Sequence, residues 1–510
     1  MTRRSLQLGP AGSGCQICIS MAAPDEAGLM RGLAAATGAD LIEVRLDALT
    51  EPLSCGGHFF RALQSRAPAP VGFTCRPVWE GGRFKGAEGE RRALLERAAR
   101  SGAAFVDIEQ DADWAEAFIA DSSVPVILSH HWQAPRPVDL EERAERMRAA
   151  GPAIAKLVTP AMTPADAIPL LAAGAELMAR GQPTAAFCLG AAGSASRVLA
   201  VSQGAALIYA AQPIGESVAA GQWRAEVLRD ELLLPRWRPG FSCCALAGDP
   251  IDHSLSPAIF NATFAVLEQP IGYLPIAFTE LDPVLDLAEA QGLRGISVTM
   301  PFKEAAVRRC AELDPMAAAM GAVNTLVRSG QGWRGYNTDA GAIVSALSDV
   351  VEISRSRVAI FGAGGAARAA AFALSAQGAA ITLCNRTRPR VDDLARQVGG
   401  RAASLEALTT DHYDIIINAT PIGMAGRTED PPMPFPAGWL RGDEVVLDLV
   451  YRPRQTALLR HAADRGCTVV EGLEMFVRQA AQQYRLWVGG DSAAPLDIMR
   501  RAAEKALQRG

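Results

Sequence analysis

Lys156 is the single charged residue in the apolar run PAIAKLVTP, a setting in which a lysine can do covalent chemistry. A lysine amine attacks a ketone only when it is neutral, and an amine that titrates at about 10.4 is rarely neutral at pH 7. Burial lowers the pKa of an amine and makes a nucleophilic lysine possible. The run therefore permits a Schiff-base lysine, although an ordinary lysine at the end of a strand is the commoner structure for such a residue taken alone.

Eight short apolar runs alternate with amphipathic, helix-like stretches between Cys15 and about Ala225. This alternation predicts a parallel (β/α)8 TIM barrel. Polar residues gather toward the carboxyl ends of the runs, the face where such barrels hold their chemistry; they are Glu43, Arg45, Arg76, His131 and Lys156. The runs are CQICISMA, ADLIEVRLDAL, VGFTCRP, AAFVDIE, VPVILSHH, AIAKLV, TAAFCLG and GAALIYAA.

A glycine-rich turn in the second half lies between an apolar strand and an alanine-rich helix, in SRVAIFGAGGAARAAAFALS. Such a turn aims backbone N–H groups at a pyrophosphate, although alanine–glycine runs also serve plain helix packing. We therefore expect a Rossmann domain, with a dinucleotide held at Gly362, Gly364, Gly365 and Ala366.

The strand after this helix, ITLC, indicates which dinucleotide is bound. It ends in Asn385, Arg386 and Thr387 rather than in the Asp or Glu that would bind the ribose 2′-hydroxyl of NAD. Arg388 and Arg390 follow, and the planar fork of arginine suits a 2′-phosphate. The turn predicts NADP(H), the alternative being a solvated basic turn.

The composition excludes several classes of protein. A chain of 510 residues exceeds what one hydrophobic core usually holds, and 49% hydrophobic with 21% charged residues is ordinary for an α/β protein. The net charge is −5 and no basic run carries interleaved aromatics, so nucleic acid is not expected as a partner. No apolar stretch reaches the roughly 18 residues that a membrane helix needs, so no membrane is expected either.

The ten cysteines indicate buried, reduced thiols of a cytoplasmic protein rather than disulfides or a metal site. Cys15 and Cys18 form a lone CxxC, but no second pair or nearby histidine pair completes a zinc shell. Gln16 and Ser20 interrupt the apolar patch at 15–23, which therefore predicts a first buried strand rather than a signal peptide.

The segment from Leu234 to Gly240 carries two prolines and a glycine, which indicates a linker. We predict a flexible tail at 1–14, the barrel at 15–234, the linker at 235–241, an α/β substrate domain at 242–348 completed by 475–508, and an NADP-binding Rossmann domain at 349–474.

The first half resembles type I 3-dehydroquinate dehydratase over nearly its whole length, through motifs that occur in order. These are LIEVRLD with Glu43, Arg45 and Asp47, TCRPVWEGG with Arg76 and Glu80, VDIE, ILSHHW, the Lys156 strand, Arg197, and AAGQ ending at Gln222. The resemblance implies that Lys156 forms a Schiff base with the ketone, that His131 is the general acid–base, and that Glu80 orients this histidine. It also implies a set of residues that hold the hydroxyls and the carboxylate of the substrate: Glu43, Arg45, Arg76, Arg197 and Gln222.

Two positions depart from this family. His130 precedes His131 where relatives usually have another polar or aromatic residue, and strand alternation directs one of the two into the barrel without saying which. Val218 stands where relatives usually carry Ser or Thr, so a substrate hydrogen bond is either missing or supplied by Ser217.

The second half, from 244 to about 490, resembles shikimate dehydrogenase. The matching blocks are AGDPIDHSLSPAIFN, GISVTMPFKE, MGAVNTL, GYNTDAGA, FGAGGAAR, NRT, INATPIGM, LDLVYRP and GLEMFVRQAAQQY. The resemblance implies that Lys303 and Asp339 carry out the proton transfer that accompanies hydride reduction of a ketone, without deciding which of them donates. It implies substrate contacts from Ser254, Ser256, Thr299, Asn324, Tyr451 and Gln479, and nicotinamide contacts from Asn418, Thr420, Gly472 and Met475.

Together the two resemblances imply a bifunctional enzyme that converts 3-dehydroquinate to 3-dehydroshikimate and then to shikimate with NADPH. One alternative is a second half that acts as a quinate dehydrogenase. Another is a non-catalytic quinate or shikimate sensor, but such a protein could have lost the catalytic residues that this chain retains: Lys156, His131, Lys303 and Asp339. We expect only small-molecule partners; the oligomeric state stays open.

Overall fold

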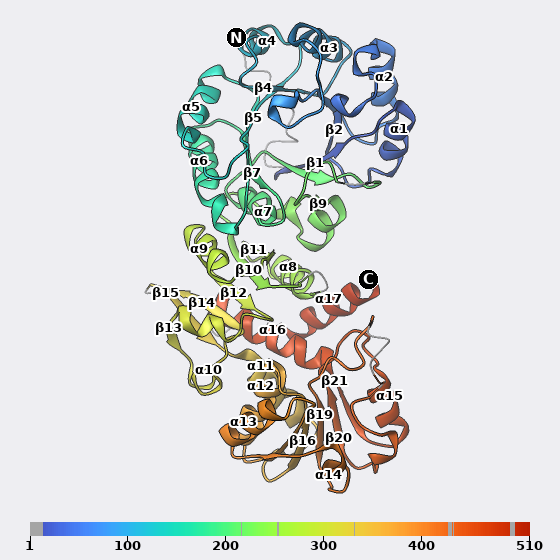
Figure 1. Ribbon diagram of the computed structural model, residues 1–510, viewed down its shortest axis with the longest axis vertical. Helices are drawn as coiled ribbons and strands as arrows, with labels where there is room; N and C mark the ends of the chain where they lie inside the picture. The colour runs from blue at the N-terminus through green and yellow to red at the C-terminus, as the bar shows by residue number, and fades with distance from the viewer. Residues whose placement is uncertain are drawn as a thin grey trace. The chain divides into compact units, whose positions relative to one another are not determined.

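The computed structural model describes residues 14–215, 217–251, 254–330, 332–426, 431, 433–489 and 495–509 (Figure 1). The chain divides into two compact units, Met1–Ala245 with Leu267–Leu293, and Leu246–Val266 with Arg294–Gly510. The tail expected at 1–14 lies outside the described residues except for Gly14. Among the described residues, no helix is long and apolar enough to cross a membrane.

The first half is built on parallel strands that coincide with the eight apolar runs. In order along the sheet they are β7-β6-β5-β4-β3-β2-β1-β8, and β9 continues the sheet beyond β8. Strands buried on both faces are mostly apolar, which is why these runs show little alternation. Their bounds are β1 Gln16–Met21, β2 Leu41–Arg45, β3 Val71–Thr74, β4 Val106–Glu109, β5 Val126–His131, β6 Ile154–Pro160, β7 Thr184–Leu189, β8 Leu207–Ala211 and β9 Trp223–Arg224.

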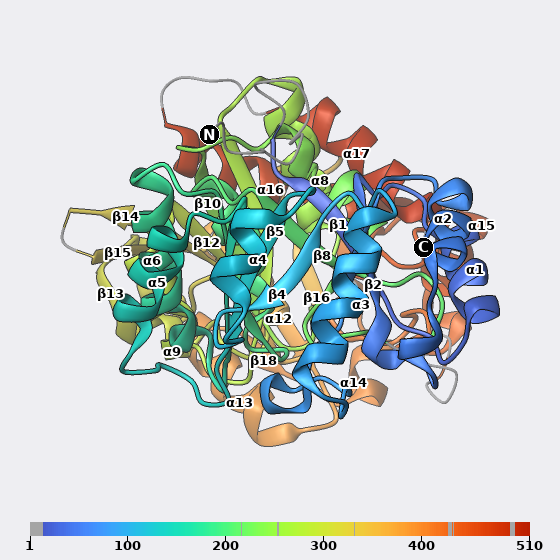
Figure 2. The same cartoon turned by 90° about the horizontal axis from the view of Figure 1, so that it is seen from above.

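The curved sheet closes where β8 returns to β7. The backbone N–H of Ala206 donates to the carbonyl of Thr184 at 2.9 Å, in place of a continuous ladder. Viewed from above, helices α1, α2 and α3 lie on one side of the strands, and α5 and α6 on the other (Figure 2). The (β/α)8 barrel is thereby confirmed. Its helices are α1 Glu26–Ala35, α2 Gly57–Arg66, α3 Glu88–Arg100, α4 Ala115–Asp121, α5 Leu140–Ala150, α6 Ala167–Ala179 and α7 Ser194–Ser202.

Short helical turns occupy several loops of the barrel and the segment after it. They are η1 Leu46–Ala48, η2 Pro52–Ser54, η3 Val78–Glu80, η4 Pro164–Asp166, η5 Val227–Glu231 and η6 Leu234–Arg236. In the segment predicted as a linker, Trp237 is buried and its indole N–H donates to the carbonyl of Leu232 at 2.9 Å. The predicted domain boundaries stay predictions.

A second sheet has the strand order β11-β10-β12-β14-β15-β13, with β14 antiparallel to both β12 and β15. Its strands are β10 Ser242–Gly248, β11 Ile271–Ala277, β12 Gly295–Val298, β13 Cys310–Leu313, β14 Thr325–Ser329 and β15 Gly332–Tyr336. The accompanying helices are α8 Ser256–Val266, α9 Asp282–Ala290, η7 Ala305–Arg309, α10 Pro315–Met320 and α11 Thr338–Ser348.

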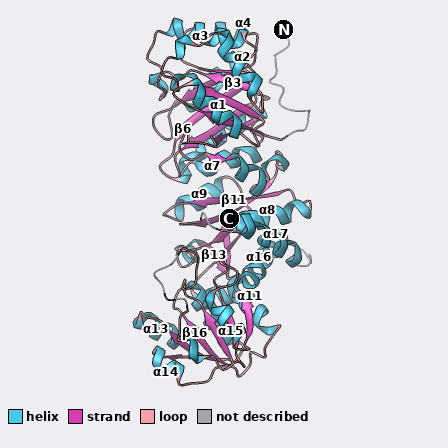
Figure 3. Cartoon of the chain, turned by 90° about the vertical axis from the view of Figure 1, so that its right-hand side faces the viewer, coloured by secondary structure: helices cyan, strands magenta, loops and turns pink. Residues whose placement is uncertain are grey.

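The third sheet is parallel, with the order β18-β17-β16-β19-β20-β21. Counted from β16, this is the 3-2-1-4-5-6 order of the Rossmann fold, whose ligands bind where the order reverses, between β16 and β19. Helices flank the sheet on both faces (Figure 3). The elements are β16 Arg357–Phe361, α12 Gly365–Ala376, β17 Ala380–Cys384, α13 Arg388–Val398, β18 Arg401–Ala402, α14 Leu405–Thr409, β19 Ile415–Asn418, η8 Ala437–Trp439, β20 Val445–Asp448, α15 Ala457–Asp464 and β21 Thr468–Glu471.

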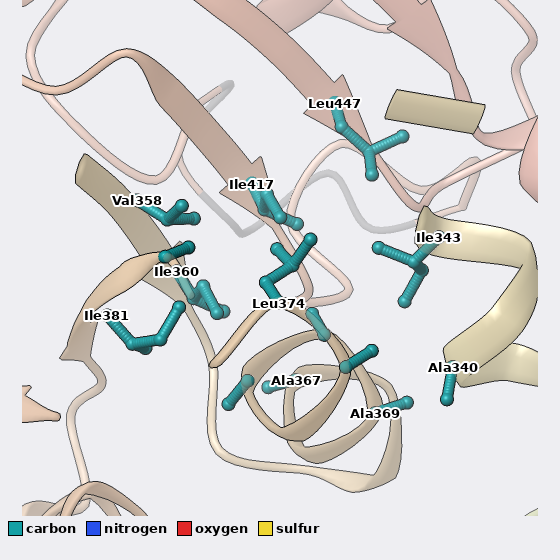
Figure 4. Close-up of a cluster of buried hydrophobic side chains, with 14 of the residues drawn as sticks. Ala340, Ile343, Val358, Ile360, Ala367, Ala369, Leu374, Ile381, Ile417 and Leu447 are labelled. Carbon is teal, nitrogen blue, oxygen red and sulfur yellow. The ribbon is translucent and has the colours of Figure 1, made fainter. Parts of the chain in front are cut away.

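The core of this third region depends on small residues. Ala367, Ala369 and Leu374 of α12 pack against Ile360 and Ile417 of the sheet (Figure 4). Alanine lets the helix approach the sheet closely, so the alanine-rich sequence is explained by packing as well as by the turn that precedes it. After β21, helices α16 Gly472–Val488 and α17 Leu496–Arg509 return to pack on α11 and α8, respectively.

Candidate active sites

The carboxyl ends of the barrel strands surround a cavity of about 360 Å³. All eight dehydratase residues named from the sequence line it: Glu43, Arg45, Arg76, Glu80, His131, Lys156, Arg197 and Gln222. They come from different strands and loops, and the common edge of the parallel sheet brings them together. Other residues of the wall include Ser20, Trp132, Phe187, Tyr209 and Val218.

Lys156 lies on β6 with its side chain 5% exposed. Its Nζ donates to Asp107 Oδ2 at 2.9 Å, lies 3.6 Å from Glu43 Oε1, and sits 4.0 Å from the centre of the Tyr209 ring. The amine therefore faces the cavity from a buried position, between two carboxylates and an aromatic face.

Asp107 belongs to a buried network on the strands beside Lys156. Its Oδ1 accepts from Arg76 Nη2 at 3.0 Å and from Ser129 Oγ at 2.6 Å. Burial by itself raises the pKa of Asp107, but Arg76 and Lys156 outweigh it, so the pKa lies below its usual value. Arg76 also donates to Glu109 at 2.7 Å, and burial raises the pKa of Glu109 to about 7 against the effect of Arg76.

The structure separates the two adjacent histidines of β5. His131 lines the cavity, and its Nδ1 lies 2.9 Å from Glu80 Oε2, the geometry expected of an oriented imidazole. Ser129 contacts Asp107 inside the barrel, and strand alternation places residue 131 on the same face. Burial first, and then Arg76 and Lys156, lower the pKa of His131 well below its usual value. His130 does not line the cavity among the described residues.

Arg197 on α7 is a buried cation that lines the cavity. Its Cζ lies 4.2 Å from the centre of the Phe187 ring, but its three guanidinium nitrogens have no hydrogen-bond partner among the described residues. Burial lowers the pKa of Arg197 to about 9. A buried guanidinium with free donors beside a cavity is suited to bind an anion such as a carboxylate.

The loop after β8 closes another part of the cavity wall. Gln222 Oε1 accepts from Ser217 Oγ at 2.8 Å and from the Ala219 N–H at 3.2 Å. Val218 lines the cavity, and Ser217, the other candidate hydroxyl, is bonded to Gln222. Arg45 also lines the cavity and pairs with Asp47 at 2.8 Å.

In the second half, Lys303 and Asp339 form a direct ion pair, with Lys303 Nζ 2.5 Å from Asp339 Oδ2. Asn324 donates to the other carboxylate oxygen at 2.8 Å and to Thr338 Oγ1 at 3.0 Å. Thr338 and Asp339 lie in the first turn of α11, so this helix start fixes the pair. Gln479 on α16 lies 3.5 Å from Thr338 Oγ1, which brings the returning helix to the same place.

The other substrate residues named from the sequence lie on nearby elements of the second half. Ser256 begins α8, and its N–H donates to Ser254 Oγ at 3.3 Å. Thr299 follows β12 and is half-buried. Its backbone N–H donates to the carbonyl of Ala247 at 2.9 Å. Tyr451 stacks against Phe476 with ring centres 4.9 Å apart, and burial raises its pKa.

The glycine-rich turn between β16 and α12 leaves an open cradle. Gly362 has φ +123°, and a Cβ there would meet the Ala419 carbonyl at 2.8 Å. A Cβ on Gly364 would meet nothing within 4 Å, and one on Gly365 would lie 3.6 Å from Lys303 Cδ. The amino end of α12 is thus exposed beside the Lys303 pair, as a pyrophosphate site at the switch point requires. Ala366, next in the helix, is half-buried.

The basic turn after β17 is open to an anion. Asn385 is half-buried, and Arg386, Thr387 and Arg390 are exposed. Arg388, by contrast, bonds Asp392 at 2.9 Å.

The nicotinamide residues named from the sequence are more enclosed. Asn418, at the end of β19, donates to Asp448 at 2.9 Å and accepts from Thr420 Oγ1 at 2.7 Å. Met475 packs in the hydrophobic core of the Rossmann region. Gly472 begins α16, where a Cβ would lie 2.6 Å from the carbonyls of Asp448 and Val450.

Sequence reasoning missed several residues that the fold places at these sites. Asp107 lay inside the VDIE block without being singled out, and it is the closest partner of Lys156. Tyr209 lies within the eighth apolar run, and Asp448 lies in LDLVYRP. A polar residue inside an otherwise apolar strand was the available signal for both aspartates.

The folds and the two lysine sites define a fusion of a lyase-type barrel with a dinucleotide-binding dehydrogenase. Family models match in the same order: type I 3-dehydroquinase at residues 17–234, the shikimate dehydrogenase substrate binding domain at 246–326, shikimate/quinate 5-dehydrogenase at 345–423, and the shikimate 5′-dehydrogenase C-terminal domain at 472–504.

A similar curated protein is the chloroplastic bifunctional 3-dehydroquinate dehydratase/shikimate dehydrogenase of Arabidopsis thaliana. It is 33% identical over 482 residues, which cover 89% of this chain and 78% of the relative. The chain therefore belongs to the bifunctional 3-dehydroquinate dehydratase/shikimate dehydrogenase family, and both predicted resemblances are confirmed.

Two further relatives match the second half alone. Shikimate dehydrogenase (NADP(+)) of Moorella thermoacetica is 38% identical over 277 residues, or 52% of this chain and 92% of that protein. The crystal structure of shikimate 5-dehydrogenase from Thermus thermophilus with NADP(H) and shikimate is 34% identical, covers 52% of this chain and 99% of its own, and has a TM-score of 0.47.

Proposed function

We propose that the first half dehydrates 3-dehydroquinate to 3-dehydroshikimate through an imine on Lys156. The neutral amine attacks the C3 ketone and releases water, and the resulting iminium acidifies the neighbouring C2–H. His131 removes that proton and returns it to the departing C1 hydroxyl, which leaves as water. Hydrolysis of the imine then frees the product and restores Lys156, so the net reaction is the loss of one water.

One observation carries this proposal: Lys156, the His131–Glu80 pair and the guanidinium of Arg197, which has no hydrogen-bond partner within the described part of the chain, face a single cavity of about 360 Å³. That volume lies within the usual range for small-molecule sites. The arrangement supplies a nucleophile, an oriented acid–base and a cation for a carboxylate, which are the three groups that the dehydration of a keto acid requires. The hydroxyl groups of the substrate would be held by Glu43, Arg45, Arg76 and Gln222.

Borohydride trapping tests the nucleophile. Reduction of the protein together with 3-dehydroquinate should leave a covalent adduct on the Lys156 peptide, detected by mass spectrometry. Lys156→Ala should abolish both the adduct and dehydration while shikimate oxidation stays near the unchanged rate, because the second site is separate. Lys85→Ala, which removes an exposed lysine of the same barrel, is the matched control. An adduct on another lysine would refute the assignment.

We further propose that the second half reduces 3-dehydroshikimate to shikimate with NADPH. The Lys303–Asp339 pair, which lies beside the glycine-rich turn, would hold the substrate oxygen and supply its proton. Ser254 and Ser256 would bind the substrate carboxylate. The remaining contacts would come from Thr299, Asn324, Tyr451 and Gln479.

The residues around the turn fit the dinucleotide. The open cradle at Gly364 and Gly365 and the amino end of α12 suit the pyrophosphate, and exposed Arg386, together with Asn385, Thr387 and Arg390, suits a 2′-phosphate. Bound NADPH supplies the hydride. The rest of the pocket would be shaped by Gly362, Ala366, Asn418, Thr420, Gly472 and Met475. Asn418 would act through the loop that its side chain holds.

A coupled assay tests both halves at once. The purified chain alone, given 3-dehydroquinate and NADPH, should produce shikimate with consumption of one NADPH for each molecule. Quinate offered with NADP+ should be oxidised far more slowly than shikimate. Faster oxidation of quinate would assign the second half to quinate instead.

We propose that the protein works in the cytosol and that its partners are small molecules, namely its acid substrates and NADP(H). Each of the ten cysteines is a free thiol, which fits a reducing compartment, although the Arabidopsis relative is named as chloroplastic. Fractionation of cells that express the full-length gene, followed by detection of the chain in membrane, organelle and cytosolic fractions, tests this localisation.

A further inference from the structure

Tyr209 lies against the reacting nitrogen of the dehydration site. Lys156 Nζ stands over the Tyr209 ring, 4.0 Å from its centre. Both groups are buried: the Lys156 side chain is 5% exposed and Tyr209 is 2% exposed. The negative face of an aromatic ring attracts a cation within about 6 Å, and the attraction grows when water is excluded. The dehydration proposed for this site gives Tyr209 no role.

The Tyr209 ring is held where the barrel closes. Tyr209 lies on β8 and Phe187 on β7, and the two rings meet with centres 5.7 Å apart and planes at 52°. Arg197 Cζ lies 4.2 Å from the centre of the Phe187 ring. The aromatic pair therefore carries two cations of the site. The amine that captures the ketone lies over one ring, and the guanidinium suited to a carboxylate lies over the other.

The ring, rather than the hydroxyl, is the part of Tyr209 that contacts Lys156. The hydroxyl oxygen is buried and has no hydrogen-bond partner within the described part of the chain. Burial first, and then Glu43 and Asp107, raise the pKa of Tyr209 well above its usual value, so the hydroxyl keeps its proton and is not a base. Donation of that hydroxyl to the substrate is the other role that Tyr209 could have, and the experiment below separates the two.

A positive charge stays on Lys156 Nζ through most of the proposed reaction. Counted from the ammonium, Nζ forms a double bond to C3 of the substrate. The ketone oxygen leaves as water with two of the three protons of the nitrogen, so the iminium keeps the one charge. Removal of the C2 proton by His131 gives a neutral enamine. Departure of the C1 hydroxyl with that proton, as water, restores a cationic iminium, which hydrolysis converts to product and free lysine.

The Tyr209 ring suits this charge in a way that the neighbouring carboxylates do not. The ammonium has three N–H donors, and the iminium has one. Asp107 Oδ2, at 2.9 Å from Nζ, and Glu43 Oε1, at 3.6 Å, therefore face fewer donors once the imine has formed. The attraction of a ring face depends on positive charge rather than on the number of N–H groups. It therefore persists from the ammonium to the iminium.

We infer that Tyr209 is a catalytic residue of the dehydration site, whose ring face stabilises the iminium that forms on Lys156 Nζ. This inference rests on the proposed dehydratase function. The ring stabilises the cationic iminium both before and after the C1 hydroxyl leaves, and the neutral enamine between them gains less. An iminium that keeps its N–H proton also keeps the positive charge that acidifies the C2–H.

The groups around Lys156 set the direction of the expected change. A weaker ring face favours loss of the iminium N–H proton, so the basic limb of the reaction should move to lower pH. The acid limb belongs to His131, which must be neutral to take the C2 proton. The other charged or titratable groups stay the same in every variant at position 209. The groups that face Lys156, or its carboxylate partner Asp107, are Cys18 on β1, Glu43 on β2, Arg76 after β3, Asp107 on β4 and His131 on β5.

The test is the pH profile of kcat for dehydration by the full-length chain, because kcat reports the substrate-bound state. Tyr209→Phe keeps the ring without the hydroxyl, and its profile should overlay that of the unchanged chain. Replacement of Tyr209 by mono-, di- and trifluorinated phenylalanine withdraws electrons from the ring face stepwise at nearly constant shape. The basic limb should move down with each fluorine, by roughly one pH unit for the trifluorinated ring. That shift is about a tenfold loss of kcat on this limb.

Trifluorinated phenylalanine at Phe59, on helix α2 of the same barrel, is the matched control and should leave the profile unchanged. Borohydride trapping with 3-dehydroquinate at a pH on the basic limb should give less adduct on Lys156 with each fluorine. A basic limb that stays in place across the fluorinated series would overturn the inference and leave Tyr209 a packing role. A limb that moves as far in Tyr209→Phe as in the trifluorinated chain would also overturn it, by assigning the effect to the hydroxyl. Failure of the unchanged chain to dehydrate 3-dehydroquinate would instead refute the proposed function, and this inference with it, before any variant is compared.

Discussion

Arg197 offers a prediction in which stability and activity move in opposite directions. Its guanidinium is buried, and its three nitrogens have no hydrogen-bond partner among the described residues. Each unpaired polar group costs about 1–3 kcal/mol of folding free energy. The cation–π contact with the Phe187 ring, 4.2 Å from Arg197 Cζ, stabilises the folded barrel by about 2 kcal/mol. Arg197→Met fills a similar volume without charge, so the variant barrel should be more stable by at least about 1 kcal/mol.

The same substitution should damage the dehydration site. Two charge-assisted hydrogen bonds from a guanidinium to a carboxylate are worth about 1.5–3 kcal/mol each, so their loss should lower kcat/KM by roughly 10²–10⁴. Arg197→Lys keeps the charge but loses the planar fork, so its activity should lie between that of the unchanged chain and that of Arg197→Met.

Calorimetry and kinetics on the full-length chain measure both effects. The unfolding transition of the barrel is identified as the one that 3-dehydroquinate shifts to higher temperature. Arg197→Met should raise that transition in the absence of ligand and should lose most of the ligand-induced shift. A variant that is less stable than the unchanged chain, yet dehydrates within about threefold of its rate, would refute the argument that Arg197 is kept unpaired for a ligand.

Three further predictions concern the second half. Arg386→Ala should weaken NADPH far more than NADH, by about 1.5–3 kcal/mol for each lost charge-assisted bond, and equal effects on the two KM values would count against phosphate recognition. Lys303→Met should lower kcat for shikimate oxidation about 10²-fold or more, as loss of an acid–base group does, while dehydration continues; retention of kcat would remove Lys303 from proton transfer. Burial raises the pKa of Asp448 from 3.8 to about 6, so the stability tied to this group is fully present below about pH 4 and is lost as the pH rises through 6. Asp448→Asn should therefore flatten the stability profile between pH 4 and 7, by up to about 3 kcal/mol, and an unchanged slope in thermal unfolding would contradict the assignment.

The barrel was predictable because its strands are encoded locally. Each of the eight apolar runs overlaps one of the strands β1–β8, since a strand buried on both faces is mostly apolar apart from residues such as Asp107 and Lys156 that form the site. The same holds for the glycine-rich turn, where Gly362 needs a φ of +123° that other residues rarely adopt. Both signals lie within a few residues of the structure that they specify.

Contacts that depend on strand register were not predictable in this way. Strand β4 pairs with β5 and β5 with β6, with Glu109 opposite Ser129 and Ser129 opposite Lys156. Across the intervening strand β5, Lys156 bonds Asp107, which lies two residues before Glu109 on β4. No local pattern contains that alignment. The choice between His130 and His131 had the same cause, because alternation gives two opposite faces and only the closed sheet says which of them is inside.

Asn418 illustrates a different limit. Its position in INATPIGM indicated a residue at the nicotinamide, and that role stays a prediction. The fold uses its amide to bond Asp448 and the carbonyl of Ile422, at 2.9 and 3.1 Å. A motif therefore points to the loop that matters, but it does not say whether a given side chain touches the ligand or holds the loop that does.

The two lysines show how similar ion pairs can be suited to unlike chemistry. Asp107, the partner of Lys156, also accepts from Arg76 and Ser129, so its charge is divided among three donors, one of them a second cation. Asp339, the partner of Lys303, bonds on its other oxygen to a neutral amide instead. The proposed roles differ as well: Lys156 is proposed as a nucleophile, and the Lys303–Asp339 pair as the group that passes a proton to and from a substrate oxygen. The set of donors on the partner carboxylate, rather than the lysine itself, therefore distinguishes the surroundings of the two sites.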